Sequence, residues 1–397
     1  MKYFKDFGLS HQLEIAIERM GFTTPTQIQE LSIPPIVSGK DVIGESATGS
    51  GKTLAFGCGI IEQVVPGGRL QALILTPTRE LAEQVNRSLR RQSNQKPLNI
   101  IAVYGGVSIG NQIRDLSKAD VVVATPGRLL DHLNRRTIDL SNVKLLVLDE
   151  ADRMLDMGFI DDVERIIRAC PSKRQTLFFS ATISTRIKDL ANRYMKDPIN
   201  VSAKKYVDPG KLKQVYYDVS KNMKLSLLAH LLQHENTELA MVFCNTRRTT
   251  DFVSKNLKAN KIKAIAIHGG LSQNKRTDTI KRFNEARPGV LVCTDVAARG
   301  LHIDDVSHIY NYEIPGDSND YVHRIGRTAR AGEEGKVINV LCEHDYDNFR
   351  KIQHEYGSFT IEKVKTPYLQ KIIVLKPESR RKPRLGRKEF YRGRKWK

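Results

Sequence analysis

The sequence predicts an α/β protein of two lobes, each a mostly parallel sheet flanked by helices, followed by a basic flexible tail. Short apolar runs alternate with helical stretches in two series, at 72–75, 121–124, 145–148 and 176–179, then at 240–243, 264–267, 290–293 and 337–341. This alternation is typical of parallel sheets with helices on both faces. A polar stretch with a Pro-Gly turn, residues 202–211, separates the two series and is expected to be a linker.

The length and composition support this division into lobes. With 397 residues, 40% of them apolar, the chain is long enough to form two hydrophobic cores. We therefore expect a first lobe at 1–201, the linker at 202–211, a second lobe at 212–375 and the tail at 376–397. Helical spacing of Leu13, Ile17 and Met20, and of apolar residues in 163–170, predicts helix faces that pack on a core.

The charge of the chain and its apolar runs indicate which partners and which compartment to expect. The net charge of +20 favours polyanionic partners, and the tail holds 11 Lys and Arg against 2 Asp and Glu. The tail has few aliphatic residues and no amphipathic stripe, so membrane binding is not expected. The chain has no signal peptide and no apolar run long enough to span a bilayer, so we expect a cytoplasmic protein. Its widely spaced cysteines predict buried, reduced thiols: Cys58, Cys170, Cys244, Cys293 and Cys342.

The first candidate site is a glycine-rich loop. Residues 49–53, Gly-Ser-Gly-Lys-Thr, follow a strand-like run at 41–44 and precede a helical stretch, which is the setting of a phosphate-binding loop. Backbone N–H groups would surround phosphate oxygens, Lys52 would reach the β and γ phosphates, and the Thr53 hydroxyl would ligate Mg²⁺. Ser46 stands where the general pattern has its first glycine. The loop is expected to consist of Ser46, Ala47, Thr48, Gly49, Ser50, Gly51, Lys52 and Thr53.

The second candidate site is the acidic tetrapeptide 149–152, Asp-Glu-Ala-Asp, which ends the apolar strand at 144–148. Ligands bind at the carboxyl edge of a parallel sheet. We expect Asp149 to hold the Mg²⁺ of a bound nucleotide and Glu150 to act as the general base on the attacking water. A solvated acidic helix start is the alternative, and it fits poorly once Lys52 is placed nearby.

With these residues the chain resembles a DEAD-box RNA helicase, a family in which two RecA-like lobes hold ATP and RNA between them. The resemblance runs in order from Phe4 to Arg330 and omits the tail. It implies that Gln29, in a segment similar to the family's Q motif, bonds the adenine edge, with the upstream Phe4 stacked on the ring and Phe22 close by. It also implies arginine fingers at Arg327 and Arg330, and nucleotide contacts from Gly300 and His302.

The resemblance also implies the residues for RNA and for coupling. RNA-backbone contacts are expected from Pro77, Thr78, Arg79, Gly106, Thr125, Gly127, Arg128, Asn245, Gln273, Thr294 and Arg299. Coupling between ATP state and strand separation is expected from Ser180, Thr182, Asp295 and His323. Two positions depart from the family pattern: His302 replaces an acidic residue, and Ala329 replaces a glycine before Arg330.

The expected function is ATP-dependent local unwinding of RNA, with ATP and Mg²⁺ as cofactors and little sequence selectivity. Basic residues and aromatic residues alternate in the tail, which predicts either a tether to structured RNA or a solubilising end. Two other classes of function remain as alternatives, an ATP-independent RNA chaperone or annealer and a DNA-directed translocase. The first would not need Lys52, and the second would be stimulated by DNA at least as well as by RNA.

Overall fold

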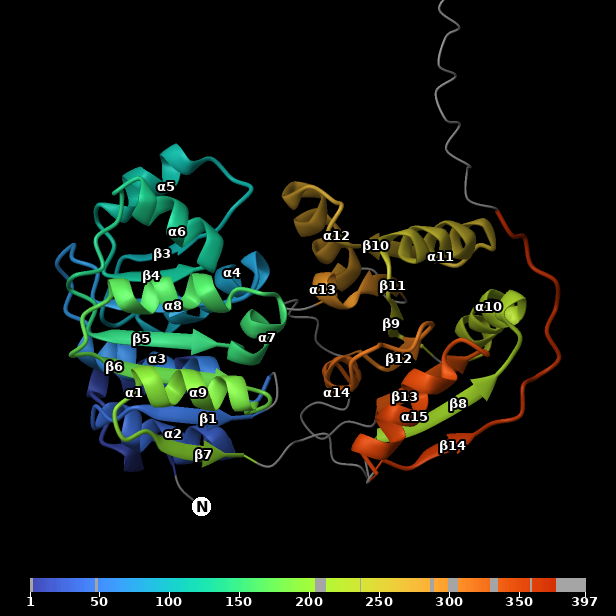
Figure 1. The fold of residues 1–397 in the computed structure, drawn as a ribbon, viewed down its shortest axis with the longest axis horizontal. Coiled ribbons are helices and arrows are strands. Elements are labelled where there is room, and N and C mark those ends of the chain that lie inside the picture. The colour runs from blue at the N-terminus through green and yellow to red at the C-terminus, as the bar shows by residue number, and fades with distance from the viewer. Residues whose placement is uncertain are drawn as a thin grey trace, which may run out of the picture.

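The computed structural model describes residues 3–46, 49–203, 212–235, 237–285, 289–298, 306–328, 335–357 and 359–375, which form two lobes side by side (Figure 1). Each lobe contains a sheet of seven strands, and every strand pairing is parallel. The predicted fold class is thereby confirmed for the two lobes, while the predicted tail lies outside the described residues.

The first lobe contains β1 to β7. Its strands are β1 (Val42–Glu45), β2 (Ala72–Leu75), β3 (Ile100–Val103), β4 (Val121–Ala124), β5 (Leu145–Asp149), β6 (Gln175–Ser180) and β7 (Ile199–Ser202). Its helices are η1 (Phe4–Phe7), α1 (His11–Arg19), α2 (Gln27–Val37), α3 (Lys52–Gln63), α4 (Arg79–Gln92), α5 (Ile109–Leu116), α6 (Pro126–Asn134), α7 (Ala151–Asp156), α8 (Ile160–Ala169) and α9 (Thr185–Tyr194).

The second lobe contains β8 to β14. Its strands are β8 (Leu212–Asp218), β9 (Leu239–Cys244), β10 (Ala264–Ile267), β11 (Gly289–Thr294), β12 (His308–Asn311), β13 (Gly335–Leu341) and β14 (Ile361–Lys363). Its helices are η2 (Lys221–Met223), α10 (Lys224–His234), α11 (Arg247–Ala259), α12 (Gln273–Glu285), α13 (Asp295–Ala298), α14 (Ser318–Ile325) and α15 (Tyr346–Glu355).

The two lobes repeat one topology. The strand order is β3-β4-β2-β5-β6-β1-β7 in the first sheet and β10-β11-β9-β12-β13-β8-β14 in the second, so each strand of the second sheet occupies the place of the strand seven earlier. This repeat is not visible as sequence similarity. Its consequence is that loops at the carboxyl edges of the two sheets come in equivalent pairs.

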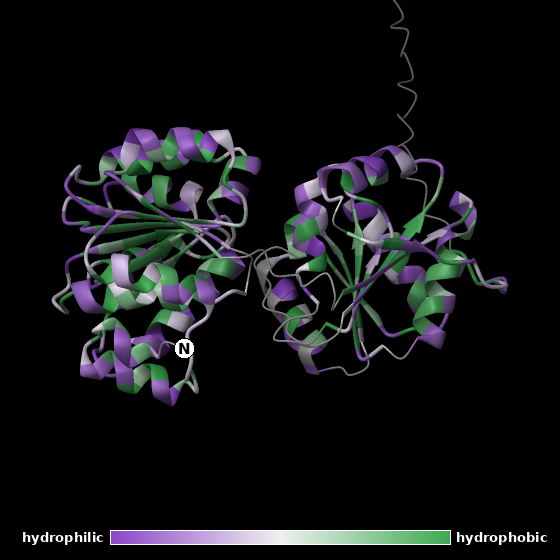
Figure 2. Cartoon of the chain, turned by 90° about the horizontal axis from the view of Figure 1, so that it is seen from below, coloured by the Kyte–Doolittle hydropathy of each residue, from purple (hydrophilic) through white to green (hydrophobic). Residues whose placement is uncertain are grey.

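Each sheet lies between two hydrophobic clusters. Apolar strands occupy the interior of both lobes, and hydrophilic residues cover the outward faces of the helices (Figure 2). The five cysteines are buried and unpaired, as predicted. Burial raises the pKa of the Cys170 thiol to about 11, so this thiol stays protonated at neutral pH. Among the described residues, no helix combines the length and apolar character that crossing a bilayer requires.

The segment after the last sheet strand follows the outside of the second lobe. Val364, Leu369 and Ile372 pack on the cluster that contains α10. Two asparagines, one in α11 and one directly after it, then bind its backbone. Asn256 accepts from Leu375 N at 2.6 Å and donates to Leu375 O at 3.2 Å, and Asn260 pairs in the same way with the backbone of Ile373 at 3.0 and 2.8 Å. We call residues 364–375 the strap.

The proposed domain boundaries stay a prediction. Ser202, which the sequence placed in the linker, is the last residue of β7, and its backbone pairs with Glu45 of β1. Residues 204–211 lie outside the described part of the chain.

A buried histidine predicts acid sensitivity of the first lobe. His132 is 0% exposed, and its ring nitrogens lie 2.8 Å from Thr137 Oγ1 and 3.1 Å from Gln112 Oε1. Burial, assisted by Arg128, lowers the pKa of His132 below its ordinary value of 6.5. Below pH 6.5 the unfolded state therefore binds more protons than the folded state.

The stability that His132 contributes should be complete above its ordinary pKa and should decline by up to about 1.4 kcal/mol per pH unit below it. Urea unfolding midpoints at pH 7.5 and 5.5 would measure this decline, and His132→Gln should reduce it. His354→Gln, at an exposed histidine of α15, is the control and should leave the decline unchanged. Equal declines in wild type and His132→Gln would rule out His132 as the source.

Candidate active site and nucleic-acid interface

A cavity of about 370 Å³, a volume typical of small-molecule sites, is lined by residues of both lobes. Nine of its lining residues were predicted from sequence as nucleotide-binding or catalytic. Four others, on α4, were not predicted, because nothing in a helical segment indicates which tertiary neighbour it faces. The lining comprises Phe22, Thr24, Thr26, Gln29, Gly49, Gly51, Lys52, Thr53, Leu54, Leu81, Gln84, Ser88, Gln92, Asp149, Glu150 and Arg327.

The glycine-rich loop is held by the start of α2. Thr26 Oγ1 donates to the Ser50 carbonyl oxygen at 2.7 Å, and Gln29 Nε2 donates to the Gly51 carbonyl oxygen at 3.1 Å. Gln29 Oε1 in turn accepts from Thr26 N at 2.9 Å, so the amide predicted to bond adenine also fastens the loop. Sequence reasoning missed Thr26, although its place one turn before Gln29 is a capping-box signal.

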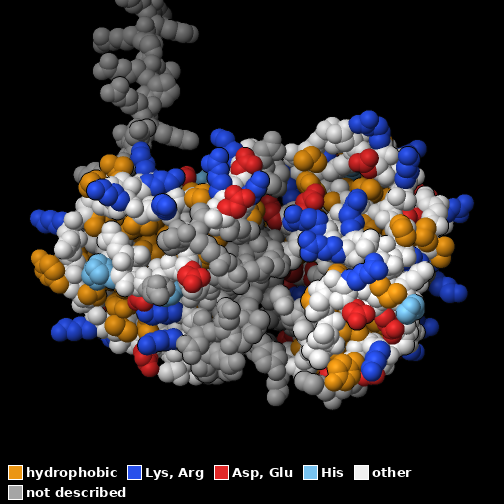
Figure 3. Space-filling model, turned by 180° about the vertical axis from the view of Figure 1, so that it is seen from behind, with side chains coloured by type: hydrophobic (Ala, Val, Ile, Leu, Met, Phe, Trp, Pro, Cys, Tyr) orange, Lys and Arg blue, Asp and Glu red, His pale blue; other side chains and the backbone are white. Residues whose placement is uncertain are grey.

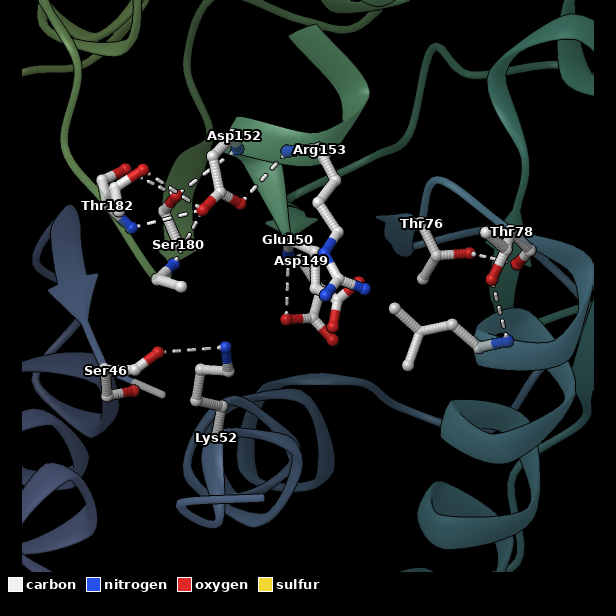
Figure 4. A network of polar contacts seen from close by, with 12 residues as sticks. Ser46, Lys52, Thr76, Thr78, Asp149, Glu150, Asp152, Arg153, Ser180 and Thr182 are labelled. Atoms are coloured by element: carbon white, nitrogen blue, oxygen red, sulfur yellow. Dashed lines mark hydrogen bonds and ion pairs between the residues drawn. The ribbon is translucent and has the colours of Figure 1, made fainter. Parts of the chain in front are cut away.

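The loop lies between β1 and α3, as predicted. Ser46 is 1% exposed, and its hydroxyl accepts from Ser50 Oγ at 2.9 Å. The Lys52 ammonium donates to the Ser46 carbonyl oxygen at 3.2 Å and is turned toward Asp149, the last residue of β5 (Figure 4). Ser46 is therefore bound to the loop through its hydroxyl and its carbonyl oxygen. Ala47 and Thr48 lie outside the described residues.

Gly51 cannot carry a side chain without disturbing this loop. Its φ is +95°, and a Cβ there would lie 2.3 Å from Gln29 Nε2. Gly51→Ala should weaken ATP binding by about tenfold or more, because the loop must leave the conformation that Gln29 fixes. Titration with a fluorescent ATP analogue would measure it. Gly316→Ala, where a Cβ meets nothing within 4 Å, is the matched control. Wild-type affinity in Gly51→Ala would contradict the assignment.

Two carboxylates stand at the carboxyl end of β5, and both are buried. Asp149 is 2% exposed, and burial raises its pKa to about 6 even though Lys52 opposes the shift. Glu150 is 3% exposed and has a left-handed backbone, with φ +53°. Burial alone would raise the pKa of Glu150, but Arg153, Lys52 and Arg327 together hold it below its ordinary value. Glu150 is therefore a carboxylate at neutral pH, which a base requires.

The last residue of the tetrapeptide connects it to β6. The Asp152 carboxylate accepts from Ala181 N and Thr182 N, each at 3.1 Å, and Asp152 N donates to Ser180 Oγ at 3.3 Å (Figure 4). Ser180 Oγ also donates to the Thr182 carbonyl oxygen at 2.7 Å. Any shift of the 149–152 turn therefore displaces residues 180–182. The coupling roles expected of Ser180 and Thr182 stay a prediction that this contact is compatible with, and Asp152 is a partner that the sequence analysis did not identify.

Two arginines near the end of α14, Arg324 and Arg327, lie in different surroundings. Arg324, on α14, is 1% exposed and bonds Asp295 through Nε and Nη2 at 2.6 and 2.7 Å, Asn245 Oδ1 at 2.9 Å, and further acceptors on the same lobe. Arg327 lies just past the end of α14 and lines the large cavity with Lys52 and Glu150. Arg324 thus organises the second lobe, whereas Arg327 reaches the site.

In the first lobe, the predicted RNA residues lie along one edge. Thr78 caps the start of α4 by accepting from Leu81 N at 3.3 Å, and Arg79 follows it. The Arg79 guanidinium packs on Gly106, where φ is +82° and a Cβ would lie 2.0 Å from Nη1. Arg128, near the start of α6, donates to the Val107 carbonyl oxygen at 3.2 Å. Thr125, Gly127 and Pro77 belong to the same two helix starts.

The second lobe has the equivalent arrangement, which the sequence did not disclose. Thr246 caps the start of α11 by accepting from Thr249 N at 3.1 Å, and Arg247 follows it. The Arg247 guanidinium lies 3.1 Å from where a Cβ of Gly269 would be. One sequence signal could have revealed this equivalence: in both lobes a Thr-Arg pair is followed later by a Gly-Gly pair. Lys and Arg side chains are present on both lobes, some of them beside the boundary between the lobes (Figure 3).

Other predicted residues are not brought into the cavity. Phe4 is 5% exposed and packs edge to face on Phe7 with ring centroids 6.0 Å apart, while Phe22, 48% exposed, is the aromatic that lines the cavity. Asn245 uses its side chain for Arg324 and the Ile314 carbonyl oxygen. Thr294 and Asp295 lie together where β11 meets α13, and His323 lies on α14. The side chain of Gln273 and the residues Arg299, Gly300, His302, Ala329 and Arg330 lie outside the described part.

Comparisons with known proteins agree with this geometry. Residues 26–190 match the family model "DEAD/DEAH box helicase", and residues 223–332 match "Helicase conserved C-terminal domain". The chain is 44% identical over 373 residues to the DEAD-box ATP-dependent RNA helicase CshA of Bacillus subtilis, covering 93% of this chain and 75% of that protein.

Two solved structures are similar over both lobes. Saccharomyces cerevisiae Dbp5 bound to RNA and ADP BeF3 gives a TM-score of 0.85 at 31% identity, over 92% of this chain and 96% of that one. A DEAD box protein from Methanococcus jannaschii gives 0.55 at 40% identity, over 91% and 99%. Because a named relative matches nearly the whole chain and the cavity brings the family's residues together, this chain belongs to the DEAD-box family of ATP-dependent RNA helicases.

Proposed function

We propose that this chain binds ATP in the cavity between its lobes, separates short RNA duplexes locally, and uses hydrolysis to release the RNA. The observation that carries this proposal is the position of Arg327, a residue of the second lobe, beside Lys52 and Glu150 of the first. A site assembled from two lobes is complete only when they are closed, so catalysis depends on closure.

The lobe arrangement supports a closed state. The chain is more similar to Dbp5 bound to RNA and ADP BeF3, with a TM-score of 0.85, than to the Methanococcus jannaschii protein at 0.55, although the second identity is higher. The Methanococcus jannaschii protein has the higher sequence identity and nearly full coverage but the lower TM-score. This combination indicates that similar lobes are placed differently in that protein and in this chain. An ion pair also joins the lobes here, with Glu80 Oε1 of α4 3.0 Å from Arg276 Nη2 of α12.

The roles of the site residues follow from their positions. Lys52 would neutralise the β and γ phosphates, Glu150 would take the proton of the attacking water, and Arg327 would stabilise the charge that develops on the γ phosphate. Arg330, as a second arginine finger, is proposed on the family resemblance alone. Gln29 and Phe22 would contact the base.

Magnesium fits the described donors. Thr53 and Asp149 both line the cavity, and Asp149 is a buried carboxylate whose charge a cation would compensate. No group of three or more His, Cys, Asp or Glu able to hold a metal occurs among the described residues, and Mg²⁺ bound through one carboxylate and nucleotide phosphates needs none. Bound there, Mg²⁺ would neutralise phosphate charge.

RNA would cross the paired edges of the two lobes. Arg79 with Gly105 and Gly106, and Arg247 with Gly269, offer guanidinium and backbone N–H groups to phosphate oxygens, and these donors cannot distinguish bases. The expected consequence is RNA binding with little sequence selectivity. Because the cysteines are free thiols, we also propose that the protein works in the cytoplasm.

The test of this function compares ATP hydrolysis with no nucleic acid, with single-stranded RNA and with DNA of the same sequence, alongside unwinding of a short RNA duplex. RNA should stimulate hydrolysis and DNA should not, and Lys52→Ala should abolish both hydrolysis and unwinding. Strand separation that survives in Lys52→Ala would favour an RNA chaperone, and equal stimulation by DNA would favour a translocase.

The basic tail gives a separate prediction. Residues 376–397 carry a net charge of +9, with Phe390, Tyr391 and Trp396 among the basic residues. We propose that the tail tethers structured RNA through phosphate contacts, so truncation after Leu375 should weaken RNA binding and flatten its salt dependence. RNA affinity measured at several salt concentrations between about 50 and 200 mM tests this proposal. An unchanged affinity and slope would contradict the tether.

A further inference from the structure

Arg153, the residue directly after the acidic tetrapeptide, is buried at the active site without touching its cavity. It lies on α7, is 1% exposed, and donates from Nη1 to Glu150 Oε2 at 2.9 Å. It is not among the residues that line the large cavity, whereas Glu150 is. Arg153 therefore contacts the lining of the large cavity, through Glu150, and not the cavity itself.

This ion pair differs from the ordinary helix pairs of the same lobe. Arg168 and Glu164 of α8 lie 2.7 Å apart, but the Arg168 side chain is 64% exposed, so water screens that pair. In the Arg153–Glu150 pair the two side chains are 1% and 4% exposed. A buried ion pair is weak evidence for stability, since both charges lose their hydration, so another role has to be sought for this one.

The rest of the Arg153 guanidinium faces the second lobe. Its Nε and Nη2 are buried and have no hydrogen-bond partner. Buried donors without partners are uncommon, and these belong to a residue that lines a second cavity of about 10 Å³, room for about one water molecule. The opposite wall belongs to the second lobe and includes the carboxylates of Asp295 and Asp320. Asp295 accepts two bonds from Arg324, so a substitution there would also release that arginine, whereas Asp320 lies on the same wall and can be changed without removing those two bonds.

We propose that Arg153 is a positioning residue that holds the Glu150 carboxylate toward the attacking water, and that closure secures Arg153 through a water-bridged contact with the acidic wall to which Asp320 belongs. This inference rests on the proposed role of Glu150 as the base. It joins the base on one lobe to an acidic residue on the other, so the base is fully oriented only when the lobes are closed.

The test uses Arg153→Gln and Arg153→Lys, with Arg168→Gln as the matched control. Arg153→Gln should lower kcat of RNA-stimulated ATP hydrolysis by about 10- to 100-fold, a part of what a general base contributes. KM for ATP and the RNA concentration for half stimulation should change by less than about twofold, as expected when only a transition-state interaction is lost. Arg153→Lys should give an intermediate kcat, because lysine keeps the charge but not the planar fork. Arg168→Gln should match wild type.

The contact between lobes is tested by combining Arg153→Gln with Asp320→Asn. Asp320→Asn should lower kcat several-fold in the wild-type chain and have little further effect in Arg153→Gln, because both changes remove one contact. If the double variant shows a loss of kcat equal to the product of the two single losses, the two residues act independently and the proposed contact between the lobes is wrong.

Other outcomes decide the positioning role. Wild-type kcat in Arg153→Gln would overturn it, as would a loss of kcat accompanied by an equal rise in KM and a lower Tm. If Arg153→Gln does not fold, Arg153→Lys decides, and the proposal requires a lower kcat at unchanged KM. Glu150→Gln tests the base itself, so failure of this inference can be told apart from failure of the proposed function. An inactive Glu150→Gln together with a fully active Arg153→Gln would reject only the positioning role of Arg153.

Discussion

Glu150→Gln should hydrolyse ATP about 10³-fold more slowly than wild type while binding ATP and RNA normally. Glutamine has the shape of glutamate but cannot accept the proton of the attacking water. It can still accept the hydrogen bond from Arg153, which lies 2.9 Å from the Glu150 carboxylate, so the fold of the 149–153 turn should persist. The backbone at position 150 is left-handed, with φ +53°, and this conformation strains glutamate and glutamine equally.

Single-turnover hydrolysis with saturating RNA would measure the loss, and RNA binding in the presence of a non-hydrolysable ATP analogue would measure what is kept. Glu18→Gln, at an exposed glutamate of α1, is the control and should be fully active. Near-normal RNA-stimulated hydrolysis by Glu150→Gln would remove Glu150 from the mechanism.

Arg327→Gln should lower RNA-stimulated hydrolysis by about 10³-fold or more, the lower limit for an arginine that stabilises phosphoryl transfer. Arg327 is 4% exposed, lines the cavity opposite Lys52, and belongs to the second lobe. Because the phosphate-binding loop and the base-contacting residues are all on the first lobe, nucleotide affinity without RNA should change little.

Measuring both nucleotide affinity and kcat distinguishes a loss of catalysis from a loss of nucleotide binding. Arg350→Gln alters an arginine of the same lobe whose side chain is 76% exposed, and it should leave both quantities unchanged. If Arg327→Gln lost nucleotide affinity and kcat together in the absence of RNA, Arg327 would be a binding residue of the open enzyme and not an arginine finger.

Residues whose role depends on local context were predictable from the sequence. A glycine-rich loop between a strand and a helix, and a carboxylate at the end of an apolar strand, reveal their chemistry within a few positions. The loop at 49–53 and the pair Asp149 and Glu150 were predicted in this way, and the structure brings them into one cavity.

Residues whose role depends on the partner element could not be predicted from their local pattern, and Arg327 was assigned only through the family resemblance. Arg324 and Arg327 are three positions apart and look equivalent in sequence. Because α14 ends at Ile325, the first stays on the helix and is enclosed by acceptors, while the second leaves it and meets the other lobe. The Asp152 bridge to residues 181–182 and the contact of Arg247 with Gly269 likewise join segments far apart in the chain.

Strands could be predicted only where their side chains carry an apolar pattern. Central strands such as β9 and β11 are continuous apolar runs, because both faces of a parallel sheet are buried. β14, with the sequence Ile-Glu-Lys at the sheet edge, has one partly buried and two exposed residues and so lacks that signature. Its pairing with β8 depends on backbone hydrogen bonds, which the side chains do not indicate.

The strap determines where the chain can be shortened without causing aggregation. A protein ending after β14 would lack Val364, Leu369 and Ile372, exposing the apolar surface they cover. The amides of Asn256 and Asn260 would also lose the backbone groups they now bind. Expression of the two lobes alone should therefore extend to Leu375, and a fluorescent protein attached there would emerge beside α11.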